Sequence, residues 1–259
     1  MNLSLFLSKL ILHKRSFIQL SFLKLYEKLN KYIFKRTFRP EYEILIDHYL
    51  SKKENKNLDH ISIIEFGVAS GKSLKYLENI KSKFEKKYKL KIKIFGFDTF
   101  EGMPKSRNKY DQLYDWKEGD YYSSYNDVNS SLKYTKLIKG DVKNSINLKL
   151  FKDNGISNVL IIFFDLDFFT STNYSFKIFE KSFSKILRPR VGLFFDNLHS
   201  SSEFSGEYLS IKKFNEKNLR NNKFISKDFY LEKFDNRFYQ YMNFEHNLFN
   251  ENLKKSQYL

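Results

Sequence analysis

The sequence predicts an α/β protein: a Rossmann-like, doubly wound sheet that is mostly parallel and ends in an antiparallel hairpin at one edge. Short apolar runs with the composition of buried strands lie at 61–66, 92–97, 136–138, 159–164 and 191–195. Helical patterns separate them at about 74–84, 142–153 and 171–187, and another follows at about 205–219. Such an alternation is typical of parallel strands joined by helices. Segments 223–231 and 236–243 then alternate polar and aromatic residues around a turn, which predicts the hairpin.

The first 60 residues are expected to form a helical extension to a single domain at 61–259. One helical face in this extension is apolar, and lysines lie off that face; it carries Phe22, Leu25, Tyr26, Leu29 and Ile33. We expect this face to pack on the domain or on the second subunit of a homodimer, in preference to a membrane surface. After Pro40 the pattern predicts a short helix at 41–50.

The composition excludes several classes of protein. With 41% hydrophobic residues, the chain of 259 residues can bury a large core, so wholesale disorder is not expected. It has no cysteine, which excludes disulfides and thiolate metal ligands and fits a cytoplasmic protein. The longest stretch without a charged residue, 154–164, has 11 residues. A membrane-spanning helix needs about 20, so no transmembrane segment is predicted.

The net charge of +16 raises the alternative of a nucleic-acid-binding protein. The 46 basic residues are mostly lysines spread along the chain, in a sequence also rich in Asn, Ile and Phe. This pattern favours a compositional origin for the charge, so nucleic acid is not expected as a partner.

The first cluster of candidate site residues surrounds the first predicted strand. Glu65, Gly67 and Gly71 form an E-x-G-x-x-x-G pattern between the strand and the next helix, and Asp98 ends the second strand. Ligands of such sheets bind at the carboxyl ends of the strands, where a glycine turn and a helix start suit a nucleotide-like molecule. The pattern is not G-x-G-x-x-G, and an acid that can hold two ribose hydroxyls favours S-adenosylmethionine over NAD.

The run from Phe97 to Pro104, FDTFEGMP, resembles the FDSFEGLP signature of the TylF/MycF-type (macrocin) O-methyltransferases. Further motifs in matching order at 116–121, 127–128, 140–146, 165–172 and 195–197 extend the resemblance over about residues 61–220. The resemblance implies a class I methyltransferase that uses S-adenosylmethionine and a divalent metal on a hydroxyl of a sugar or other small molecule. Residues expected to hold the methyl donor are Glu65, Gly67, Gly71, Asp98, Thr99, Phe100 and Asp141, the last toward the adenine amine.

The second cluster is acidic. Asp165 and Asp196 end consecutive predicted strands, and if those strands pair, their ends lie about 5 Å apart. Together with Asn197 they are expected to bind a hard cation, most simply Mg²⁺. Asp167 is then expected to be the general base. The resemblance implies the same division of roles.

The chain departs from the family pattern at two site positions. Phe169 stands in place of a tyrosine, and Asn197 in place of an acid. These departures raise the alternative of a catalytically inactive methyltransferase fold kept for interaction. A long polar and aromatic insertion at about 103–131, which contains Trp116, is expected to be a lid or else a disordered loop. His199 is a candidate for lining the acceptor site, and Ser171 and Thr172 are expected to be N-caps.

Overall fold

The computed structural model describes residues 39–111, 116–221 and 223–248. In this part of the chain, a seven-stranded sheet has the order β3-β2-β1-β4-β5-β7-β6. The strands are β1 (His60–Phe66), β2 (Lys91–Asp98), β3 (Thr135–Lys139), β4 (Val159–Phe164), β5 (Leu187–Phe195), β6 (Ile225–Lys227) and β7 (Phe238–Met242). Strand β7 runs antiparallel to β5 and β6, and the other pairs are parallel. The predicted fold class is confirmed.

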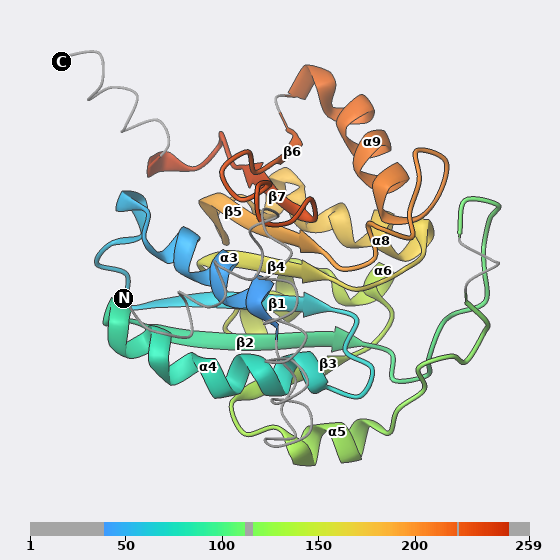
Figure 1. Cartoon of the computed structure of the whole chain (residues 1–259), viewed down its shortest axis with the longest axis horizontal. Helices are drawn as coiled ribbons and strands as arrows, with labels where there is room; N and C mark the ends of the chain where they lie inside the picture. Colours follow the sequence, from blue (N-terminus) through green and yellow to red (C-terminus); the bar gives the residue numbers. More distant parts are fainter. Residues whose placement is uncertain (1–38, 112–115, 222, 249–259) are drawn as a thin grey trace, which may run out of the picture.

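Helices cover both faces of the sheet (Figure 1). Figure 1 shows α3 and α4 together over the near face. The α-helices are α3 (Pro40–Leu50), α4 (Lys72–Tyr88), α5 (Tyr125–Ser131), α6 (Val142–Ser145), α7 (Leu148–Asp153), α8 (Phe169–Ser175) and α9 (Gly206–Asn218). Short 3₁₀ turns are η1 (Lys53–Asn55), η2 (Phe176–Phe179), η3 (Lys181–Phe183) and η4 (Leu219–Asn221). In the described ranges no helix is both long and apolar enough to cross a membrane.

Each face of the sheet carries its own hydrophobic core, because successive strand residues point to opposite sides. Ile63 of β1 belongs to the cluster under α3 and α4, and the next residue, Ile64, belongs to the cluster on the other face. The ring of Tyr42 in α3 stacks on Phe163 of β4, with 3.8 Å between the ring centroids. Helix α3 is therefore part of the core. The apolar face predicted at 22–33 lies outside the described residues.

The helix predicted at 171–187 is wrong beyond Ser175. Helix α8 ends there, two 3₁₀ turns follow, and β5 begins at Leu187. The buried aromatic residues Phe176, Phe179 and Phe183 recur every three or four positions, a spacing that α-helical and 3₁₀ backbones both produce. Glu180 has an extended backbone (φ −67°, ψ 156°), which separates the two turns. The helix predicted at 142–153 is likewise divided into α6 and α7.

Gly67 makes the turn after β1 possible. Its φ is +86°, in the left-handed region that favours glycine. A Cβ at this position would lie 1.8 Å from the carbonyl oxygen of Asp165, so the turn crosses directly over the end of β4. This close crossing brings the first glycine turn and the acidic loop after β4 to one edge of the sheet.

Candidate functional site

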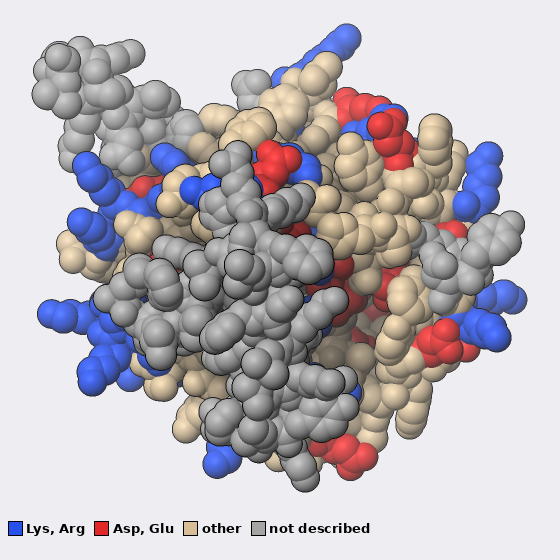
Figure 2. Space-filling view, viewed as in Figure 1, with Lys and Arg blue, Asp and Glu red and all other residues tan. Residues whose placement is uncertain are grey.

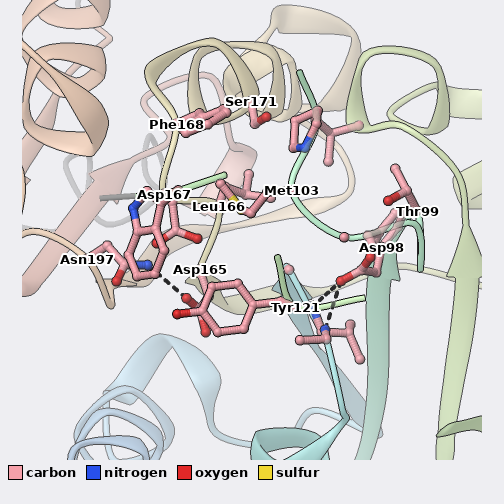
Figure 3. Close-up of a pocket in the computed structure, with 18 of the residues that line it drawn as sticks. Asp98, Thr99, Met103, Tyr121, Asp165, Leu166, Asp167, Phe168, Ser171 and Asn197 are labelled. Atoms are coloured by element: carbon pink, nitrogen blue, oxygen red, sulfur yellow. Dashed lines mark hydrogen bonds between the residues drawn. The ribbon is translucent and has the colours of Figure 1, made fainter. Parts of the chain in front are cut away.

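A cavity of about 410 Å³ lies at the carboxyl edge of the parallel strands. Its size falls within the range of small-molecule sites. Figure 3 shows Asp98 and Thr99 on one side of it and Asp165, Asp167 and Asn197 on the other. We call these sides the donor wall, formed after β1 and β2, and the acidic wall, formed after β4 and β5.

Most of the predicted site residues line this cavity. Those that do are Gly67, Asp98, Thr99, Asp141, Asp165, Asp167, Asp196 and Asn197. The remaining three, Glu65, Gly71 and Phe100, and also His199, are not among its lining residues. The structure thus brings together the two clusters, which are far apart in the sequence, and leaves these four residues outside the cavity.

The carboxylate of Asp98 fixes the donor wall. Its Oδ2 accepts hydrogen bonds from the backbone N–H groups of Val68 (2.6 Å) and Ala69 (2.9 Å), and its Oδ1 accepts one from Phe100 (2.6 Å). These bonds tie the turn after β1 to the turn after β2. Since each carboxylate oxygen has two acceptor sites, Asp98 keeps the capacity to bind a further donor from the cavity.

Asp141 closes another part of the cavity. It caps α6 by accepting a hydrogen bond from the Lys143 backbone N–H (2.9 Å), and its other oxygen lies 3.0 Å from Arg107 Nη2 in an ion pair. The pair joins the loop after β3 to the insertion, since Arg107 belongs to the insertion. Both side chains remain partly exposed to the cavity and solvent.

Glu65 lies fully buried below the cavity. Its Oε1 accepts a hydrogen bond of 3.1 Å from the Tyr42 hydroxyl, and its Oε2 has no hydrogen-bond partner among the described residues. Burial, with the nearby charge of Asp165, raises the pKa of Glu65 to about 8. Glu65 therefore does not line the cavity, and its hydrogen bond connects β1 to α3.

The acidic wall is built by neighbouring strands. β4 and β5 pair in parallel, so Asp165 and Asp196, which follow them, lie side by side as predicted. The Asn197 side-chain amide donates a hydrogen bond of 2.8 Å to Asp165 Oδ1 (Figure 3). Burial, and next the charge of Asp196, raises the pKa of Asp165 to about 6.

Asp167 has the properties expected of a base. It is 6% exposed and has a φ of +55°, a conformation that aspartate tolerates better than most residues and that is common at functional sites. Burial, followed by the charges of Asp165 and Asp196, raises its pKa to about 8. Its side chain extends into the cavity near Asn197 (Figure 3).

The acidic wall does not fit the expected metal site well. Asp196 Oδ1 is paired with two guanidinium groups, those of Arg39 (3.0 Å) and Arg237 (3.1 Å). Asn197 presents its amide N–H group to Asp165, whereas a cation would need its oxygen. Across 39–111, 116–221 and 223–248, no group of three or more His, Cys, Asp or Glu side chains is arranged to hold a metal ion.

Several residues at the site carried no recognisable sequence signal. They are Arg39, Arg237 and Glu207. Glu207 is fully buried in α9 and accepts a hydrogen bond of 3.1 Å from the Asn197 backbone N–H; burial, then the charge of Asp165, raises its pKa well above the usual value. The one signal that could have indicated Arg39 is Pro40, which starts α3 and so fixes where the preceding residue points.

The insertion is attached to the domain on the acidic side. Asp111, 3% exposed, accepts hydrogen bonds from the backbone N–H groups of Thr170 (2.9 Å) and Arg107 (2.9 Å). The N-cap prediction for Ser171 and Thr172 is wrong, because α8 begins earlier, at Phe169. Trp116 lines the cavity, and its buried indole N–H has no hydrogen-bond partner among the described residues.

Figure 2 shows acidic side chains gathered around a hollow in this face, with most of its lysines and arginines toward the periphery. The charge that faces the opening therefore differs from the net charge of the chain. An opening of this kind suits a small molecule better than a long polyanion such as nucleic acid.

No protein-family model matches the sequence, and no curated protein matches it significantly. The fold is nevertheless similar to solved structures. CalS11, described as a calicheamicin methyltransferase, aligns over 92% of this chain and 90% of its own, with a TM-score of 0.55 and 18% identity. The O-methyltransferase NovP aligns over 78% of each chain, with a TM-score of 0.55 and 10% identity. The chain therefore has the fold of these class I methyltransferases.

Proposed function

We propose that this protein is an S-adenosylmethionine-dependent O-methyltransferase that acts on a hydroxyl of a sugar or other small molecule. The observation that carries the proposal is a single cavity with the Asp98 turn on one wall and the buried Asp167 on the other. The descriptions of CalS11 and NovP as methyltransferases support it, as does the motif resemblance.

The donor wall would hold the methyl donor. Asp98 Oδ1 has acceptor capacity left for one ribose hydroxyl, and Gly67 lets the backbone approach the ligand without a Cβ. Asp141 would lie toward the adenine amine, and Thr99 beside Asp98. Glu65, Gly71 and Phe100 would act from outside the cavity, by shaping the turns that line it.

Asp167 would be the general base. Bound S-adenosylmethionine supplies an electrophilic methyl group on a sulfonium. Asp167 would accept the proton of the acceptor hydroxyl as the oxygen forms its bond to the methyl carbon, and the electron pair of the breaking C–S bond would stay on sulfur. The products are the methyl ether, S-adenosylhomocysteine and protonated Asp167. A base with a pKa near the working pH suits this task.

The proposal does not include the Mg²⁺ expected at Asp165, Asp196 and Asn197, because the first two carboxylates are already engaged by the Asn197 amide and by guanidinium groups. In their observed arrangement, Asp165 and Asn197 would shape the acceptor side and position the loop that carries Asp167. No step of the proposed transfer needs a ligand outside the donor and the acceptor.

The test has two stages. Calorimetry with S-adenosylmethionine and S-adenosylhomocysteine should show binding of one molecule per chain, and NAD should not bind. A panel of nucleotide sugars and free sugars with methyl-labelled donor should then yield a labelled product. Binding of NAD without binding of either sulfur nucleotide would refute the proposal. Donor binding without transfer to any acceptor would favour the inactive fold.

A further inference from the structure

Asp196 is already paired with positive charge. Its Oδ1 accepts hydrogen bonds from Nη1 of Arg39 at 3.0 Å and from Nη1 of Arg237 at 3.1 Å. Arg237 Nη1 also lies 3.3 Å from the backbone carbonyl oxygen of Asp196. Charge-assisted bonds of this kind are about twice as strong as neutral ones. A cation that approached this carboxylate oxygen would have to displace two guanidinium groups.

The guanidinium of Arg237 is fixed in place. It donates to both carboxylate oxygens of Asp235, at 2.8 Å from Nη2 and at 3.1 and 3.2 Å from Nε. Its Cζ lies 4.6 Å from the ring centroid of Phe194 in β5. Paired hydrogen bonds to a carboxylate and contact with an aromatic ring both restrict the motion of a guanidinium group.

The guanidinium of Arg39 is held from the other side. It precedes α3, which is anchored in the core by Tyr42, and its Cζ lies 5.5 Å from the Tyr42 ring centroid. Its Nη1 is also 3.4 Å from Glu41 Oε1. The side chain lines the cavity and is only 25% exposed. Arg39 therefore places a permanent positive charge on the acidic wall.

Asn197 also lowers the affinity that the acidic wall would have for a cation. An acid at position 197 would give the wall a further carboxylate. The amide of Asn197 adds no charge, and it donates its N–H group to Asp165. Affinity for hard cations depends on the number of charged oxygen ligands, so this substitution weakens the site before the arginines are considered. Two independent features thus reduce metal binding.

We infer that Arg39 and Arg237 take the electrostatic role that a divalent cation would have beside Asp196, so that the acidic wall excludes metal. This inference rests on the proposed function, because it assigns the arginine pair to the acceptor side of the same cavity. Both guanidinium groups would hold Asp196 and the adjoining loop in place.

The test measures binding of Mn²⁺, a hard cation detectable by electron paramagnetic resonance, to the full chain without donor or acceptor. The wild-type protein should show no saturable Mn²⁺ binding. The Arg39→Gln and Arg237→Gln double variant should gain binding at least about tenfold tighter, because Asp196 then loses both of its cationic partners. Arg39→Lys should behave as the wild type, since the charge is kept. Arg190→Gln is the control, because that arginine pairs with Glu54 at 3.1 Å outside the cavity.

Saturable Mn²⁺ binding by the wild type that disappears in Asp196→Asn would overturn the inference. If the double variant does not fold, as judged by thermal unfolding, Arg39→Gln alone decides: unchanged Mn²⁺ binding contradicts the inference, and a gain supports it. Failure of the proposed function would look different, as an absence of S-adenosylhomocysteine binding by the wild type, which the Mn²⁺ titration does not involve.

Discussion

The Tyr42 hydroxyl donates a hydrogen bond of 3.1 Å to Oε1 of Glu65, and both side chains are completely buried. The bond joins α3, which lies outside the region of motif resemblance, to the carboxyl end of strand β1. It leaves Oε2 of Glu65 without a hydrogen-bond partner in the described ranges. Burial raises the pKa of Glu65 and outweighs Ser73, Arg39 and Tyr42, which favour its ionised form.

This environment predicts a pH dependence of stability. The pKa of Glu65 rises from 4.5 in the unfolded chain to about 8 in the folded protein, so the folded state binds the proton more tightly. The stabilising effect is complete below pH 4.5 and is lost as the pH rises through about 8, at a cost on the order of a few kcal/mol. Glu65→Gln should flatten the decline in unfolding free energy between pH 5 and 9, measured by urea unfolding.

The exposed Glu101→Gln is the control for that experiment and should leave the decline unchanged. An identical pH profile for Glu65→Gln and the wild type would show that Glu65 does not titrate in this window.

A pair of glycine variants separates backbone strain from steric overlap. Gly67 and Gly119 both have a φ of +86°, but a Cβ at Gly67 would lie 1.8 Å from the Asp165 carbonyl oxygen, and a Cβ at Gly119 would meet nothing within 4 Å. Gly119→Ala should cost about 1–2 kcal/mol of unfolding free energy through its conformation alone. Gly67→Ala should cost several kcal/mol more or prevent folding. Equal melting temperatures for the two variants would contradict the close approach of Gly67 to the Asp165 carbonyl group.

Asp98→Ala should weaken binding of S-adenosylhomocysteine by about tenfold to a hundredfold. The variant loses the charge-assisted bond to the ligand, worth about 1.5–3 kcal/mol, and also frees the N–H groups of Val68, Ala69 and Phe100. Calorimetry measures the loss, with Asp127→Ala, an exposed aspartate in α5, as the matched control. Unchanged affinity in Asp98→Ala would remove Asp98 from the donor site.

Asp167→Asn should lower the turnover number by about 10²–10⁴-fold, the usual contribution of a positioned general base. Binding of S-adenosylhomocysteine should be retained, because Asp167 lies on the wall opposite Asp98. Steady-state kinetics and calorimetry on one preparation measure both quantities. Full turnover by the variant would mean that another group takes the proton, and Asp165→Asn would be the next variant to assay.

Local patterns predicted the parallel strands and the carboxyl edge where the acids meet. Runs such as 159–164 are buried on both faces, so their composition alone identifies them. The two arginines beside Asp196 could not be predicted in this way. Arg39 and Arg237 reach the same carboxylate from elements far apart in the chain, and neither belongs to a motif. Contacts between residues far apart in the chain produce no repeating pattern in the local sequence, so they cannot be predicted from it.

The part of the predicted helix that follows Ser175 forms 3₁₀ turns for a related reason. Phe176, Phe179 and Phe183 satisfy a helical spacing, but Arg188-Pro189-Arg190 already belongs to β5, and the chain must reach the start of that strand. The strand begins at Leu187, earlier than its apolar core suggests, and the extended backbone of Glu180 interrupts the helical pattern before the strand is reached.

The positions of the two arginines also determine when the site can exist during synthesis of the chain. Arg39 is available early, but Arg237 lies directly before β7, the strand that inserts between β5 and β6. A nascent chain that has folded its parallel strands would carry Asp196 with only one of its two guanidinium partners. The acceptor side would therefore be completed last, when β7 enters the sheet, and C-terminally truncated chains would keep the donor wall but lack a finished acidic wall.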